Sequence, residues 1–252
     1  MERSIKNQAS ALARHQIRFR HHLRVRKRIH GGRREFLSKT ISAQIHAWSA
    51  VISLLGIAAL AYVSIQQNTG KLIAAIIFGI SCFLLFSASA LVHFFCDGFR
   101  VSKRIENLLE TLDRLCIYLL IAGTYTAVLY YNLTEPMRTW SLAAIWSLAA
   151  LGVLYTIFFE KMPQILQSRV VSTGQYVLMG WIGLFCIEEL IASLSMTQKA
   201  LSLTGGLLYT VGAVIFAIER PNISRYFGYH EIWHTLVAFG CLSFVAVVFL
   251  SQ

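Results

Sequence analysis

The chain of 252 residues is 56% hydrophobic and only 14% charged, whereas soluble domains carry about a quarter charged residues. This balance excludes a water-soluble globular enzyme and predicts an all-α bundle that crosses a membrane several times. The net charge of +11 is concentrated at one end of the chain, and no basic groove interleaved with aromatic residues accompanies it. We therefore expect membrane lipids, and no nucleic acid, as partners.

The N-terminal segment, residues 1–41, holds twelve lysines and arginines but only two acids, Glu2 and Glu35. Such a composition is typical of a flexible tail or of a segment that lies on anionic lipid headgroups. An organellar targeting segment, which is also rich in arginine and poor in acids, is the alternative interpretation. A cleavable signal peptide is not expected, since the first apolar run starts far from the N-terminus. We predict a basic tail at 1–41 and a transmembrane domain at 42–252.

Apolar windows of about 18 or more residues predict transmembrane helices. Seven such windows follow the tail, and their predicted bounds are 42–66, 72–95, 115–133, 140–159, 173–194, 201–218 and 232–250. The fifth is the least uniform, because Glu188 and Glu189 interrupt it. The pattern predicts a seven-transmembrane helical bundle.

The orientation of the bundle follows from lysines and arginines in the connections. The side that includes the tail carries twenty of them, and the opposite side carries only three, Lys71, Arg138 and Lys199. This asymmetry predicts a cytoplasmic N-terminus and a C-terminus outside. The expected location is the plasma (inner) membrane, or an organellar membrane if the tail is a targeting segment.

Polar residues of kinds that bind metals gather at the predicted cytoplasmic ends of three helices. His93 lies at the end of the second helix, and Asp113 lies at or just before the start of the third. His230 and His234 open the seventh helix, one turn apart and therefore on one face. Such groups are costly in a membrane unless they are paired or bind a metal. The topology predicts that they converge at one depth.

Three histidines suit zinc, which favours neutral imidazole nitrogens and keeps one coordination position for water at catalytic sites. We predict His93, His230 and His234 as ligands of Zn²⁺. Asp113 is a predicted catalytic residue, which either ligates the metal or accepts a proton from the water. Ser89, one turn before His93, is predicted to orient these groups or to polarise a substrate carbonyl.

Two competing interpretations use neighbouring residues. Glu231 follows His230, so the string also fits the His-Glu-x-x-His pattern of zinc proteases, although the motif opens a membrane span and no third ligand follows nearby. Asp97, one turn after His93, competes with Asp113 for the carboxylate role. Since a lone histidine at a helix end is usually an interfacial polar group, the zinc hypothesis depends on convergence.

These residues stand in strings that resemble the haemolysin III family, within the larger group of progestin and adiponectin receptor-like proteins. The second helix carries SASALVHFF, which supplies the family's Ser-x-x-x-His as Ser89 and His93. The third carries LDRLCIYLLIAGTYT with the family aspartate at Asp113, and the seventh carries YHEIWH. The resemblance covers about residues 35–250. One departure is Arg114, which stands where the family usually has histidine.

The resemblance implies a seven-helix fold, with zinc held by the three histidines near the inner face and the aspartate beside the metal. It implies no ligand role for His46, which matches a first-helix histidine of the family. Receptor-branch relatives and the distantly related alkaline ceramidases imply hydrolysis of a lipid amide such as ceramide. The bacterial branch implies a role in membrane-lipid homeostasis.

We therefore predict a zinc-dependent hydrolase of a membrane-lipid amide or ester, or a protein of membrane-lipid homeostasis. A non-enzymatic receptor or sensor with a structural zinc is one alternative, and a fourth protein ligand would distinguish it. A pore-forming cytolysin is the other, in which Glu188 and Glu189 are the acids that would contribute to a path across the bilayer.

Overall fold

The computed structural model describes residues 33–97, 99, 101–224 and 227–251, without the side chains of 33–40 and 97. Within these residues seven helical spans are long and apolar enough to cross a membrane, which confirms the predicted all-α, seven-span fold. Helices are the expected solution, because a lipid-embedded backbone must satisfy its own hydrogen bonds. Most of the predicted basic tail lies outside the described residues.

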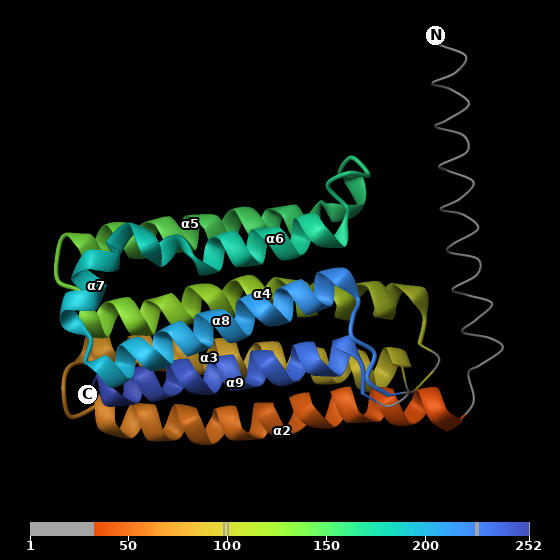
Figure 1. The fold of residues 1–252 in the computed structure, drawn as a ribbon, viewed down its shortest axis with the longest axis horizontal. Coiled ribbons are helices and arrows are strands. Elements are labelled where there is room, and N and C mark those ends of the chain that lie inside the picture. The colour runs from red at the N-terminus through yellow and green to blue at the C-terminus, as the bar shows by residue number, and fades with distance from the viewer. Residues whose placement is uncertain (1–32, 98, 100, 225–226, 252) are drawn as a thin grey trace, which may run out of the picture.

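The helices follow one another with short connections (Figure 1). Their bounds are α2 Arg33–Ser64, α3 Thr69–Leu91, the π-helical segment η1 Val92–Asp97, α4 Lys103–Asn132, α5 Met137–Ile157, the 3₁₀ turn η2 Phe159–Lys161, α6 Arg169–Gly180, the 3₁₀ segment η3 Ile182–Cys186, α7 Ile187–Ser193, α8 Met196–Ile218 and α9 Tyr229–Leu250.

The third span begins earlier than the apolar window indicated. α4 starts at Lys103 rather than at residue 115, and the Ser102 side chain caps it by accepting a hydrogen bond from the Ile105 backbone N–H. The added turns carry charged residues, which a hydropathy window rejects but an amphipathic helix end tolerates. Asp113 therefore lies inside the helix, and its predicted place at the helix start is wrong.

The fifth span is not one continuous helix. It consists of α6, η3 and α7, with the break at Gly180–Ile182. At this break the Tyr125 hydroxyl of α4 donates to the Gly180 carbonyl at 2.7 Å and accepts from the Gly183 N–H at 2.9 Å. Irregular backbone inside a bilayer requires such partners, so one side chain of α4 stabilises the interruption.

Helix α4 lies at the centre of the bundle and contacts α3, α5, α6, α7 and α9. Figure 1 shows α5 and α6 on one side of α4 and α8, with α3, α9 and α2 on the other. Close helix approach depends on small residues: a Cβ added at Gly152 of α5 would lie 2.1 Å from the Tyr118 ring of α4.

The outer surface of the bundle is apolar. On α2, Trp48, Leu55 and Tyr62 are 66% to 70% exposed, an arrangement that is unfavourable in water and favourable in lipid. Because successive spans run in opposite directions, the end of α3 and the starts of α4 and α9 lie at the same end of the bundle.

Candidate metal centre

His93 belongs to the π-helical segment η1 that extends α3. π-Helical turns are uncommon and are frequent at functional sites. The imidazole is 8% exposed, so its polar atoms are largely removed from solvent. This burial requires a partner for the ring nitrogens.

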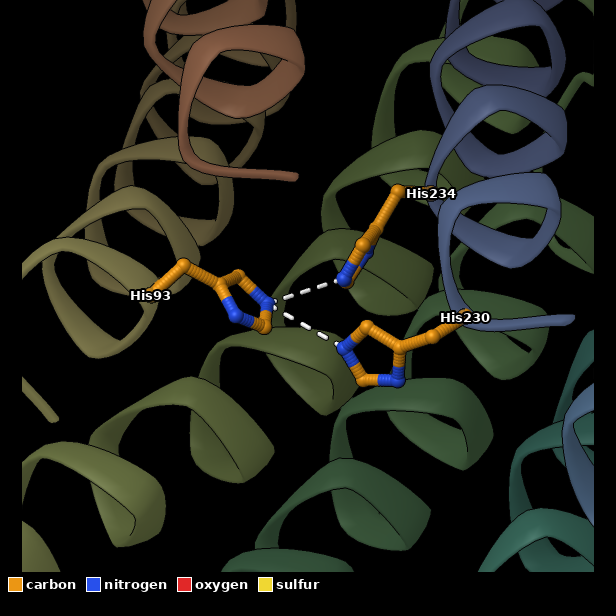
Figure 2. A group of neighbouring side chains, drawn as sticks. All are labelled: His93, His230 and His234. Carbon is orange, nitrogen blue, oxygen red and sulfur yellow. Dashed lines mark hydrogen bonds between the residues drawn. The ribbon is translucent and has the colours of Figure 1, made fainter. Parts of the chain in front are cut away.

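His230 and His234 occupy the first turns of α9, which begins at Tyr229. His234 is 4% exposed and His230 is partly buried. Their four-residue spacing places both on one helix face, and Figure 2 shows both rings directed towards His93.

The three rings meet through their Nε2 atoms. The Nε2 of His93 lies 2.9 Å from that of His234 and 3.3 Å from that of His230 (Figure 2). All three nitrogens lie within 4.8 Å of one another. The predicted convergence of these histidines is confirmed.

Hydrogen bonds among the three rings account poorly for this arrangement of nitrogens. A ring nitrogen of a neutral imidazole has either one proton or one lone pair, whereas the Nε2 of His93 faces two other nitrogens. A zinc ion with Zn–N distances of about 2.0 Å and tetrahedral angles separates its nitrogen ligands by about 3.3 Å. The spacing and chemistry of the three nitrogens therefore fit a metal ion.

Asp113 and Ser89 lie beside the histidines but outside the group of converging ligand atoms. Both line a cavity that His234 also lines, and the Asp113 carboxyl interacts with the Ser89 hydroxyl and with the His93 ring. Within the described residues, the group that fits a metal ion contains only the three histidines. This arrangement favours Asp113 as a neighbour of the metal over Asp113 as a ligand.

Glu231 has a different environment from that of a protease base. Its carboxylate accepts hydrogen bonds from the Ser42 hydroxyl of α2 at 3.0 Å and from the Gly228 backbone N–H at 2.8 Å. It thus caps α9 and connects it to α2. The His-Glu-x-x-His interpretation loses its catalytic glutamate, while the rival Asp97 has a side chain outside the described part of the chain.

A fourth histidine, to which the sequence assigned no ligand role, lies against the site. His46 of α2 is 2% exposed, and its ring centroid is 4.0 Å from that of His234 in an edge-to-face arrangement. Neither of its ring nitrogens has a hydrogen-bond partner in the described structure. A buried polar side chain in the first span is the signal that could have identified it.

The cavity beside the histidines has a volume of about 420 Å³ and a mainly apolar lining. One end is lined by His46, Ser89, Asp113 and His234, and the lining continues along α8 to Lys199. From Ala213, which also lines it, to Lys199 the helix rises about 20 Å. The backbone break of the fifth span, including Gly180 and Gly183, forms part of the wall. The cavity has the length and polarity of a site for one long apolar chain.

Comparisons with known proteins place these features among relatives. The family model described as haemolysin-III related matches residues 35–245. The chain is 34% identical to Hemolysin-3 of Bacillus cereus over 218 residues, covering 85% of this chain and 93% of the relative. It is 35% identical to a Hemolysin-3 homolog of Bacillus subtilis (strain 168), covering 79% and 92%. It is 28% identical to the monocyte to macrophage differentiation factor of Homo sapiens, covering 77% and 75%.

Proposed function

We propose that this chain, which belongs to the haemolysin-III related family of membrane proteins, holds a zinc ion and hydrolyses an amide or ester bond of a membrane lipid. The observation that carries the proposal is the meeting of three histidine Nε2 atoms beside a long apolar cavity, one end of which His234 lines. A metal site alone would fit many roles, but a lipid-sized cavity beside it favours a lipid substrate.

His93, His230 and His234 would hold the metal, through the Nε2 atoms that lie closest to one another. When bound, zinc supplies a Lewis acid that polarises a carbonyl and makes water a better nucleophile at neutral pH. Three protein ligands is the number typical of catalytic zinc sites, whereas structural zinc sites usually have four.

Asp113 moves the proton. Its carboxyl lies beside Ser89 and His93 at the polar end of the cavity, where it takes a proton from the attacking water and returns it to the leaving nitrogen or oxygen. Water oxygen bonds to the carbonyl carbon, and the C–N or C–O bond breaks. The products are a fatty acid and an amine or alcohol.

Ser89 and the cavity position the substrate. The Ser89 hydroxyl interacts with the Asp113 carboxyl and lies at the cavity wall, so it orients this carboxyl or donates to the carbonyl oxygen. The apolar lining holds the acyl chain and excludes water. The charge asymmetry of the connections favours the cytoplasmic side of the membrane for this reaction.

The cytolysin alternative receives less support from the same observations. Glu188 and Glu189 are exposed at the start of α7 and are not among the residues that line the cavity. His46, Ser89, Asp113 and His234 lie together at one end of a mainly apolar cavity, and the lining offers no continuous polar path, so ion conduction is disfavoured.

The experiment combines metal analysis with a lipid assay. Purified protein in liposomes should contain one zinc per chain and release fatty acid from an N-acyl lipid or an acyl ester. His230→Ala should lose both properties. Gln164→Ala, at an exposed position between α5 and α6, is the matched control and should keep both. Turnover by His230→Ala at the wild-type rate would overturn the mechanism.

A further inference from the structure

Unsatisfied polar atoms in this molecule are concentrated at one contact. Among the described residues, four buried side-chain nitrogen or oxygen atoms have no hydrogen-bond partner: His46 Nδ1, His46 Nε2, His234 Nδ1 and Ser202 Oγ. Three of the four belong to the two rings that touch each other. Buried polar atoms without partners are rare and require an explanation.

The two rings come from different helices and are enclosed. His46 lies on α2 and His234 on α9, with ring centroids 4.0 Å apart and planes at 75°. Two further rings lie near His46: Phe86, with centroids 5.4 Å apart, offers no nitrogen or oxygen, and His93, with centroids 6.4 Å apart, directs its Nε2 to His230 and His234. At 2% and 4% exposure both rings are removed from the outer surface, and both line the cavity.

Metal binding by one ring nitrogen of His234 would determine which of its nitrogens needs a hydrogen-bond acceptor. If Nε2 binds a metal, the proton of the neutral ring resides on Nδ1, and this N–H nearly always donates to a carboxylate, carbonyl or water. The carboxylate on the same helix, Glu231, already accepts from Ser42 and Gly228. Neutral His46 has one lone-pair nitrogen in either tautomer and is in contact with the His234 ring.

We infer that His46 is the positioning residue of the metal centre: it accepts a hydrogen bond from the Nδ1–H of His234 and so fixes the orientation of that ligand. This inference rests on the metal binding in the proposed function. The bond requires a reorientation of the two rings, whose centroids are 4.0 Å apart. The second His46 nitrogen then carries the ring proton, and since His46 lines the cavity, that N–H is the donor left for a polar group held there.

The test compares metal affinities of full-length protein. Wild-type protein is titrated with Zn²⁺ against a chelator of known affinity, and His46→Phe should bind zinc about 10- to 100-fold more weakly, the usual effect of removing such a partner. His46→Gln or His46→Asn, which restores an acceptor oxygen, should recover most of the affinity. Phe86→Leu perturbs the same packing without removing an acceptor and should leave the affinity unchanged.

Two further readouts separate positioning from general structural damage. The absorption spectrum of the Co²⁺-loaded protein should change in His46→Phe and return towards wild type in His46→Gln. The metal-free His46→Phe protein should unfold at the wild-type temperature or above, because two unsatisfied nitrogens are gone. If His46→Phe does not fold, His46→Leu replaces it beside His46→Gln.

The outcomes distinguish the two claims. Wild-type protein that binds neither Zn²⁺ nor Co²⁺ contradicts the proposed function itself. Wild-type protein that binds zinc, together with an apolar His46 variant of equal affinity and unchanged Co²⁺ spectrum, overturns the inference about His46 alone. Equal losses in His46→Phe and His46→Gln would also overturn it.

Discussion

The hydroxyl of Tyr125 accepts a hydrogen bond from the Gly183 N–H at 2.9 Å, at the point where the fifth span stops being an α-helix. The same hydroxyl donates to the Gly180 carbonyl at 2.7 Å. One phenol on α4 thus satisfies two backbone groups that a continuous helix would have satisfied internally. Because Tyr125, Gly180 and Gly183 all line the cavity, the break also shapes its wall.

Removing this hydroxyl should destabilise the fold. Tyr125→Phe leaves the Gly180 carbonyl and the Gly183 N–H without that partner, at an expected cost of about 2 kcal/mol in unfolding free energy. Thermal or denaturant unfolding in detergent measures it. Tyr62→Phe, at a site 70% exposed on α2, removes the same atom at little cost. Equal stability of both variants would contradict the role of Tyr125.

Metal removal should lower stability through the histidine cluster. A ligand that binds only the folded state stabilises it by about 2.7 kcal/mol at a free concentration of one hundred times its Kd. Zinc should therefore raise the unfolding temperature of chelator-treated wild-type protein, and His93→Ala, His230→Ala and His234→Ala should each lose this response. A response retained in any of the three variants would remove that residue from the ligand set.

Asp113→Asn should separate chemistry from metal binding. The amide keeps the size of the carboxyl but does not accept the proton, so we expect turnover to fall by about 10² to 10⁴ with zinc still at one per chain. Glu110→Gln, at an exposed position on the same helix, loses the same charge and should retain activity.

The opposite result for Asp113→Asn has a specific meaning. Loss of zinc from this variant would identify Asp113 as a fourth protein ligand. A closed coordination sphere of that kind favours a structural zinc in a receptor or sensor.

Filling the cavity should alter the preference for acyl-chain length. Gly206 of α8 lines the cavity, and a Cβ added there meets no atom within 4 Å. Gly206→Leu should therefore fold normally but reduce turnover of long-chain relative to short-chain substrates by at least about tenfold. Gly56→Leu on α2 adds the same side chain in open space outside the cavity lining and should leave the ratio unchanged. An equal effect on both chain lengths would argue against acyl binding there.

The helical spans and the clustering of the three histidines were predictable from local patterns. Long apolar windows indicate helices because lipid supplies no hydrogen bonds to the backbone, and the four-residue spacing of His230 and His234 fixes a common face. The proximity of His93 to these two histidines was predictable because successive spans run in opposite directions, which brings the end of α3 beside the start of α9. Hydropathy missed the early start of α4, because the first turns of this helix are charged. It also missed the break after Gly180, because the hydrogen bond from Tyr125 that supports the break leaves no signal in an apolar window.

The membrane class, the number of spans and the meeting of the three histidines at one end of the bundle follow from the sequence, because they depend on hydrophobic length and on the order of spans. Which side of each helix faces the interior of the bundle depends instead on how the helices pack. Helix α2 is apolar around most of its circumference, so its pattern has little periodicity to indicate a buried face. Packing against α3 and α9 decides it, and that rotation brings His46 against His234 and Ser42 to Glu231. The contacts around the histidine cluster are therefore a property of helix packing.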